Sequence, residues 1–381
     1  MTRVYLLLLT LSLVGFAQGP PNCTEDISLI NGEGGSTPCS YQDPPNSGNY
    51  VFTHSAVEKI NIRGNDANIV SLSFPNLVSV EKSIRIAYNQ PGAITQISFP
   101  SLRTAGSVQI DNNPGLVSID LPHLMSIMND ERDAYLRIQS NDNLETFSTP
   151  LLEGISSGQT AYLQVRYNPV LETIDFPHLR TLEATDDYGE AYVFIGNNDT
   201  VQTLSMNNLQ RLSAGWESIS YLIVDDMLNL EQISFPQLTE LLPDGGAYNF
   251  NELTVGHCPR LVEFVFPKLE RVSVLQLSSL ESTRKVMFPN LRELEYLWVW
   301  RSCENAESTL KMYICSEQSI GDIYFSDNGL CGPAGYMLYS INPDNAAACD
   351  AYDTCQSFTP EVTDCHCGAP GLCTVDTSLE P

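Results

Sequence analysis

The amino-acid sequence predicts an all-β protein, a single-chain parallel β-solenoid of about eleven coils with disulfide-rich caps. Three observations predict this fold class. A Phe-Pro phrase recurs along the chain, an apolar-x-apolar-x-x-Asn motif stands between its copies, and no ten-residue stretch of the repeat has helical spacing. A repeat of roughly 22–31 residues that keeps one register over most of a chain is typical of solenoids.

The Phe-Pro phrase predicts a corner in each coil. Proline has no N–H to donate to a strand ladder and fixes φ, so it is expected where one strand ends and the next begins. The phrase occurs seven times, as SFPNL at 73–77, SFPSL at 98–102, DLPHL at 120–124, DFPHL at 175–179, SFPQL at 234–238, VFPKL at 265–269 and MFPNL at 287–291.

The motif between these phrases predicts a strand that buries one face and ends at a polar marker residue. The residues three and five positions before the marker are apolar, as the period-2 alternation of a half-buried strand requires. We expect the marker side chains to form a buried structural ladder that bonds the backbone of adjacent coils. The predicted ladder comprises Asn65, Asn89, Asn113, Asn141, Asn168 and Asn198, with Cys258 at the same position as a buried, inert thiol.

The ends of the chain indicate a secreted protein with two caps. The apolar run after Arg3, followed by Gly15 and Ala17, predicts a signal peptide over residues 1–17. Residues 18–55 then form an N-terminal cap, 56–302 the solenoid repeats, and 303–381 the last coils and a Cys-rich C-terminal cap. A secreted chain favours disulfides, and we expect a Cys23–Cys39 bridge, with the pairing of the other eight left open. Those eight are Cys303, Cys315, Cys331, Cys349, Cys355, Cys365, Cys367 and Cys373.

Two Asn-x-Thr sequons, at Asn22 and Asn198, predict N-glycosylation in such a compartment. No further apolar segment predicts a membrane anchor after signal cleavage, and no motif indicates a metal site or a cofactor. The Cys365-His366-Cys367 run favours bridged cysteines over a metal ligand set.

The negative charge of the chain excludes polyanionic partners. The chain has 46 Asp and Glu against 19 Lys and Arg, a net charge of −27. Nucleic-acid binding needs many cations to neutralise phosphates, and docking on anionic lipid needs the same. The sequence therefore predicts no nucleic-acid partner and no membrane surface.

Aromatic residues on the exposed side of the marker strands form the candidate binding site. Tyrosine occupies the same position, six residues before the marker, in four consecutive coils. The distance from the corner residue to the next marker is 18 to 22 residues in five coils and 13 or 14 residues in the others. Insertions at one corner of a repeat often border a binding face. Two interpretations stay open, a binding surface or a stack that only stabilises the sheet. The candidate residues are Tyr135, Arg137, Tyr162, Tyr192, Phe194, Tyr221, Tyr296 and Trp298.

The repeat resembles a known family. Leucine-rich repeats place the next leucine two residues after the asparagine, whereas here it comes three after, as in Asn168-x-x-Leu171. The pattern resembles the receptor L-domain class of β-helix, a leucine-rich-repeat-like fold. It is most similar to fungal cell-wall and sporulation-type secreted or GPI-linked surface proteins. The resemblance is best over Phe74–Ile127 and covers roughly 55–330. It implies a glycosylated, non-enzymatic protein of the extracellular space or cell wall.

We therefore expect a secreted structural and recognition protein that binds an extracellular polysaccharide or protein partner through its aromatic face. Two alternatives remain. A carbohydrate-active β-helix enzyme would need paired carboxylates within ~5–10 Å, but the exposed-face acids Asp111 and Asp225 are predicted four coils apart. A receptor-ectodomain-like ligand-binding fragment would have the same fold.

Overall fold

The computed structural model describes residues 26–30, 40–42, 48–64, 69–243, 251–283, 285–300, 310–315, 322–326, 336–341 and 365–367. The described residues form β-strands and turns without a helix, and the strands stack in parallel as a β-solenoid. The predicted fold class is confirmed at this level. None of the described segments is a helix able to cross a membrane.

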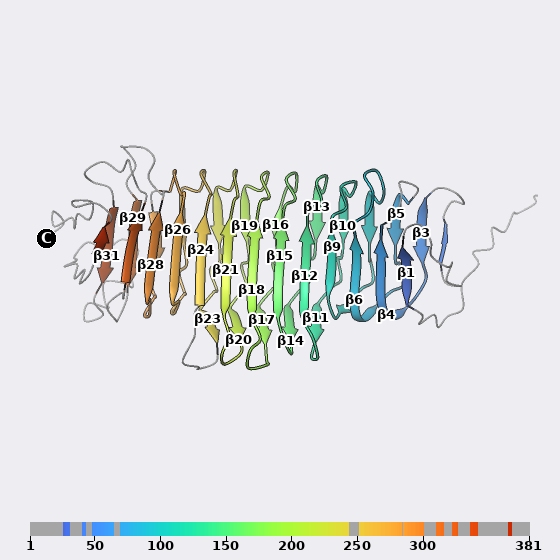
Figure 1. Cartoon of the computed structure of the whole chain (residues 1–381), viewed down its shortest axis with the longest axis horizontal. Helices are drawn as coiled ribbons and strands as arrows, with labels where there is room; N and C mark the ends of the chain where they lie inside the picture. Colours follow the sequence, from blue (N-terminus) through green and yellow to red (C-terminus); the bar gives the residue numbers. More distant parts are fainter. Residues whose placement is uncertain are drawn as a thin grey trace, which may run out of the picture.

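The largest sheet has 19 described strands. They form two files, each a row of equivalent strands from successive coils. The long strands run across the long axis of the molecule (Figure 1). They are β1 (Ile27–Ile30), β4 (Ala56–Arg63), β6 (Ser79–Ala87), β9 (Val108–Asp111), β12 (Ala134–Gln139), β15 (Ala161–Arg166), β18 (Ala191–Gly196), β21 (Ser220–Asp225), β24 (Asn251–Gly256), β26 (Val274–Ser278), β28 (Tyr296–Trp300), β30 (Asp322–Ser326) and β32 (Cys365–Cys367).

The second file of this sheet consists of short strands before the long ones. It comprises β8 (Thr104–Ala105), β11 (Ser126–Asn129), β14 (Gly154–Ser157), β17 (Thr181–Ala184), β20 (Arg211–Ala214) and β23 (Glu240–Pro243). The last five, which we call the lip strands, belong to the five coils with extra residues, and Figure 1 shows them projecting below the long strands. The insertions are thus partly a paired extension of the sheet and not loops alone.

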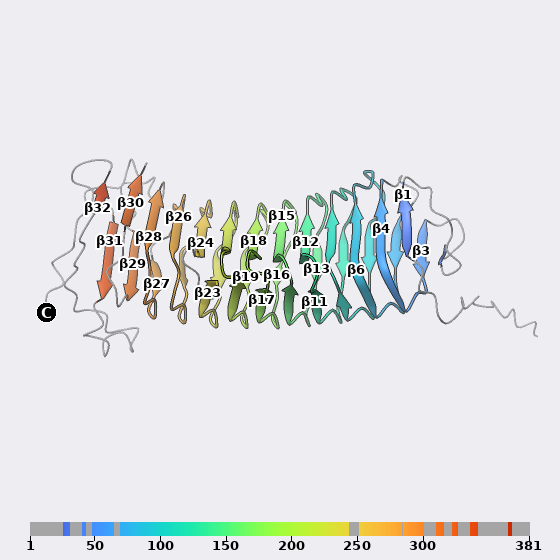
Figure 2. The same ribbon diagram turned by 60° about the horizontal axis from the view of Figure 1, so that its bottom comes forward.

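Two further sheets close the coils on another side, and Figure 2 shows several of their strands. One has six strands, β2 (Ser40–Gln42), β3 (Asn49–Phe52), β5 (Ser71–Ser73), β7 (Gln96–Ser98), β10 (Ser118–Asp120) and β13 (Thr146–Ser148). The other has seven, β16 (Ile174–Asp175), β19 (Thr203–Ser205), β22 (Gln232–Ser234), β25 (Glu263–Val265), β27 (Lys285–Phe288), β29 (Leu310–Cys315) and β31 (Tyr336–Ile341). All pairings are parallel except β2 with β3.

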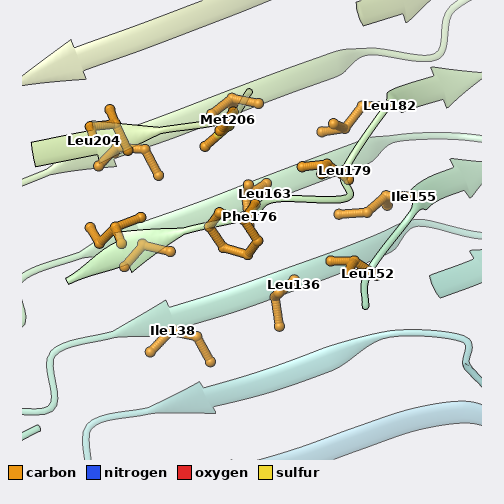
Figure 3. Close-up of a cluster of buried hydrophobic side chains, with 14 of the residues drawn as sticks. Leu136, Ile138, Leu152, Ile155, Leu163, Phe176, Leu179, Leu182, Leu204 and Met206 are labelled. Atoms are coloured by element: carbon orange, nitrogen blue, oxygen red, sulfur yellow. The ribbon is translucent and has the colours of Figure 1, made fainter. Parts of the chain in front are cut away.

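The core is one continuous file of apolar side chains between the sheets. Alternate residues of β12, β15 and β21 are buried, as the apolar-x-apolar motif predicts. The corner phenylalanines point inward, and the rings of Phe74 and Phe99 stack 4.3 Å apart. Figure 3 shows the side chains of successive coils packed over one another. Because each coil contacts only its neighbours, stability is shared along the stack.

A ladder of asparagine side chains closes the corner after the long strands. Asn89, Asn113, Asn141, Asn168 and Asn198 are all buried. The Nδ2 of each of the first four donates to Oδ1 of the next, at 2.7 to 3.2 Å. Asn113 Nδ2 also donates to the Ile86 carbonyl of the preceding coil, so one asparagine links three coils.

The residue before each ladder position has a left-handed backbone. Ser140 and Tyr167 have φ of 54° and 55°, and the same conformation recurs in other coils. This conformation turns the chain sharply, so that the following asparagine points inward. A left-handed φ is costly for residues other than glycine, asparagine and aspartate. The ladder hydrogen bonds compensate for this local strain.

Strands of the solenoid sheets lie in both segments predicted as caps. In the N-terminal segment β1 pairs with β4, and in the C-terminal segment β32 pairs with β30. The side chains of the ten cysteines predicted as disulfides, and the residues Asn22 and Asn65, lie outside the described part of the structure.

Candidate functional site

Four tyrosines of adjacent long strands form a continuous stack. The register pairs Tyr135 with Tyr162, Tyr162 with Tyr192, and Tyr192 with Tyr221. Ring centroids are 4.5 to 4.7 Å apart and the planes deviate by 4 to 11°. The faces of the two inner rings are therefore covered by neighbouring tyrosines. Only ring edges and hydroxyls of Tyr162 and Tyr192 can meet a ligand.

The hydroxyls of Tyr162, Tyr192 and Tyr221 stay protonated at ordinary pH. Burial raises the pKa of the phenols of Tyr162, Tyr192 and Tyr221 well above the usual range. The negative charge of Glu190 adds to this effect at Tyr192 and Tyr221. A hydrogen bond joins the hydroxyls of Tyr192 and Tyr221. The edge therefore presents neutral groups that can donate and accept hydrogen bonds.

Arg137, predicted as a binding residue, forms an ion pair with Asp111 of the preceding coil. Its guanidinium lies 3.3 Å from the Asp111 carboxylate, and Gln109 donates to the same carboxylate oxygen at 2.9 Å. Asp111 is fully buried, although its position in the strand alternation predicts exposure. Long side chains of adjacent strands cover it. This corrects the expectation of an exposed carboxylate and gives Arg137 a structural role.

Phe194 is also covered. The Arg166 guanidinium lies 3.7 Å from the centre of the Phe194 ring, a cation–π contact between adjacent coils. Arg166 donates to the Tyr167 hydroxyl at 3.1 Å as well. The face beside the tyrosine stack is therefore internally paired and is not a row of open aromatic planes.

Tyr296 and Trp298 do not join the stack. They lie on β28, which is separated from Tyr221 by β24 and β26. Glu252 and Val274 occupy the tyrosine position in those two strands. Trp298 is exposed and Tyr296 is half-buried. The structure thus splits the predicted aromatic face into a four-tyrosine stack and a distant pair.

A pocket of about 420 Å³ opens at the Tyr135 end of the stack. Tyr135 lines it together with four neutral polar residues, which are Ser83, Ser107, Asn129 and Gln159. Ser107 precedes β9 and stands at the file position that tyrosine occupies in the following coils. The pocket therefore lies at the boundary between the last coil without a lip strand and the first coil with one. Sequence spacing located Tyr135 but did not distinguish it from the other three tyrosines.

A wider hollow of about 600 Å³ lies on the seven-stranded sheet, lined by Ile233, Val262 and Phe264 among others. It coincides with a splayed strand pair, since β22 and β25 pair at the single position Ser234–Val265. This hollow lies away from the tyrosine stack and its lip strands.

The fully buried Asn198 cannot serve both roles that the sequence assigns to it. Its Nδ2, the atom that a glycan would occupy, donates to the carbonyls of Val165 and Gly196 at 2.9 Å. Glycosylation at Asn198 conflicts with the ladder, because the ladder uses the acceptor atom.

Cys258 is free and fully buried at the next-but-one ladder position, as its spacing predicts. Burial raises the pKa of its thiol to about 12, and Sγ lies 2.9 Å from the Gly256 carbonyl. A thiol in this environment is not a nucleophile at neutral pH.

Sequence spacing missed one cluster. His257 Nδ1 lies 2.8 Å from Asp225 and 3.9 Å from Asp226, where three ligand-type side chains from two coils meet. Asp225 and His257 are 32 positions apart, but the repeat register brings them together, since His257 directly precedes ladder position 258 as Asp226 precedes ladder position 227. The His257–Asp225 hydrogen bond itself accounts for the arrangement.

These observations define a class, a parallel β-solenoid with a buried asparagine ladder, a half-buried tyrosine stack and a one-sided lip. Comparisons with models of known families, with curated proteins and with solved structures give no match for this chain.

Proposed function

We propose that the chain is a secreted, non-enzymatic protein of the extracellular space or cell wall that recognises a polysaccharide or protein partner. The observation that carries this proposal is the coincidence of the lip strands with the tyrosine stack. Four of the five lip strands, β11, β14, β17 and β20, precede the long strands that bear Tyr135, Tyr162, Tyr192 and Tyr221. A wall that accompanies all four tyrosine coils, and one further coil, favours a recognition surface over a stack that only stabilises the sheet.

The non-enzymatic part of the proposal is supported by the positions of Asp111 and Asp225, two acids that the strand pattern places on the outer face of the long strands. Asp111 and Asp225 occupy equivalent positions of β9 and β21, four strand spacings or roughly 19 Å apart. That separation exceeds the ~5–10 Å between carboxylates in glycoside hydrolysis. Asp111 is also paired with Arg137 and has no access to solvent.

Binding is tested by sedimentation with insoluble polysaccharides and wall fractions. We expect the secreted wild-type protein to sediment with at least one of them. A Tyr135/Tyr162/Tyr192/Tyr221→Ala variant with an unchanged circular dichroism spectrum should remain in solution. A Tyr88/Tyr167→Ala variant is the matched control, because these exposed tyrosines lie at the other end of the long strands. A wild-type protein that stays in solution with every fraction would contradict polysaccharide recognition.

The proposal also includes about eleven coils and two disulfide-rich caps, as expected for a secreted solenoid. A thiol count tests the caps. We expect no reaction of the native protein with a thiol reagent at pH 8, because Cys258 is buried. In denaturant without reductant one thiol per chain should react, since the other ten of the eleven cysteines are bridged. A count of three or more would disprove fully oxidised caps.

A further inference from the structure

We infer that the pocket at the Tyr135 end of the stack binds a neutral saccharide unit, packed against the open face of the Tyr135 ring. This inference rests on the proposed function and names the ligand class of the same surface.

Tyr135 differs from the other tyrosines in having one face without an aromatic neighbour in the stack. Tyr162 covers the other face at 4.6 Å. The residue beside Tyr135 in the preceding coil is Ser107, whose short side chain lines the pocket. The tyrosine plane thus forms a wall of the pocket. An aromatic plane offers an apolar surface for the C–H face of a pyranose ring, as aromatic side chains do for other amphipathic groups.

The remaining lining is polar and mixed in charge. Arg132 is positive, and Glu131 and Asp133 are negative. Lys82 is paired with Glu58, so the lining carries charges of both signs and no positive excess. The neutral polar groups of Ser83, Ser107, Asn129 and Gln159 add donors and acceptors. A mixed set of this kind suits hydroxyl groups better than a phosphate, a carboxylate or a metal ion. The net charge of −27 also repels acidic glycans at long range.

The wall formed by residues 129–133 is fixed to the next coil. Gly158 N–H donates to the Asn129 carbonyl at 2.9 Å, and Ser157 Oγ donates to the Arg132 carbonyl at 2.6 Å. A Cβ at Gly158 would lie 1.9 Å from the Asp130 carbonyl oxygen, so the two segments approach too closely for a side chain. A pocket whose wall is held in this way loses little entropy on binding.

The size and shape of the pocket favour a saccharide over a protein partner. Its volume of about 420 Å³ falls within the ~300–1,000 Å³ of small-ligand sites. A stable protein interface needs about 800 Å² of each partner, chiefly on a broad surface. The pocket therefore accommodates one or two sugar units of a longer chain.

The test is calorimetric titration of the full secreted protein with hexasaccharides. The neutral probes are β-1,3-glucan, β-1,4-glucan, mannan and chitin hexamers, and hexagalacturonate is the anionic probe. We expect a neutral probe to bind and the anionic probe not to bind. Tyr135→Ala should weaken binding about tenfold, equivalent to ~1.4 kcal/mol, and Tyr135→Phe should preserve it. Tyr167→Ala, at the other end of the long strands and outside the stack, should retain wild-type affinity.

A second variant separates recognition from stability. Ser107→Tyr extends the stack by one coil and fills the pocket. We expect it to lose binding while its thermal midpoint stays unchanged or rises. If the stack were only structural and the ligand bound elsewhere, the Ser107→Tyr variant would bind as tightly as the wild-type protein.

The failures are distinguishable. Binding that is insensitive to both Tyr135→Ala and Ser107→Tyr overturns the pocket and leaves polysaccharide recognition by the face. Preference for the anionic probe overturns the neutral ligand class. Absence of binding to every probe overturns the inference, and the sedimentation experiment then decides separately on the proposed function.

Discussion

Replacing Asn168 by alanine is expected to lower the free energy of unfolding by about 3–5 kcal/mol. Asn168 Oδ1 accepts from the backbone N–H and the Nδ2 of Asn141, at 3.2 Å each. Its Nδ2 donates to the Ile138 carbonyl at 3.1 Å and to Asn198 Oδ1 at 3.2 Å. Alanine leaves these buried groups without partners, and each such group costs about 1–3 kcal/mol. Urea denaturation followed by circular dichroism measures the loss.

The matched control for Asn168→Ala is Asn143→Ala. Asn143 is exposed and also bonds a backbone carbonyl of the preceding coil, that of Pro114. Water replaces this bond in the variant, so we expect a change within about 0.5 kcal/mol. Equal effects of the two substitutions would disprove an energetic role for the buried ladder.

Replacing Arg137 by alanine is expected to destabilise the fold by about 2–4 kcal/mol. The substitution leaves the Asp111 carboxylate buried with Gln109 as its remaining hydrogen-bond partner. Removing one partner of a buried ion pair costs about 3–5 kcal/mol. We expect the lower part of that range, because the Arg137 side chain is 29% exposed and part of its attraction is screened. The denaturant midpoint reports the effect.

Two controls identify the uncompensated charge as the cause. Adding Asp111→Asn to Arg137→Ala should restore most of the lost stability, because the amide buries no charge. Arg211→Ala removes a surface pair, in which Arg211 lies 3.8 Å from Glu183 and both side chains are more than 40% exposed. We expect less than about 1 kcal/mol from that change. No rescue by Asp111→Asn would contradict a charge effect.

The asparagine ladder and the Arg137–Asp111 ion pair differ in how far repeat spacing predicts them. The spacing placed Asn168 in a buried ladder, because every coil offers the same corner and the same unsatisfied backbone groups. It placed Asp111 on the outer side of β9, where Gln109 and Arg137 also lie, but the expected exposure of Asp111 was wrong. The alternation of a strand describes its own direction only, whereas Arg137 and Gln109 cover Asp111 by reaching along and across strands.

Repeat spacing predicted the candidate site in part. The common spacing of Tyr135, Tyr162, Tyr192 and Tyr221 implies a stack, since equal positions in parallel in-register strands lie one strand spacing apart. The spacing also drew Tyr296 and Trp298 into the same surface, although two strands without aromatic residues at that position intervene. The proximity of His257 to Asp225 and Asp226 has a signal in the repeat register, because His257 directly precedes ladder position 258 as Asp226 precedes ladder position 227 in the adjacent coil.

The sequence by itself determined the solenoid, its buried strands, the ladder corner and the inert Cys258. These features repeat in identical local surroundings, so a periodic pattern encodes them. Only the tertiary structure decided that a pocket opens at the Tyr135 end of the stack, that Asn198 has no free amide for a glycan, and that Arg137 neutralises a buried acid. These features depend on contacts between unlike coils, and the physical reason is that neighbouring side chains, not strand alternation, determine what solvent can reach.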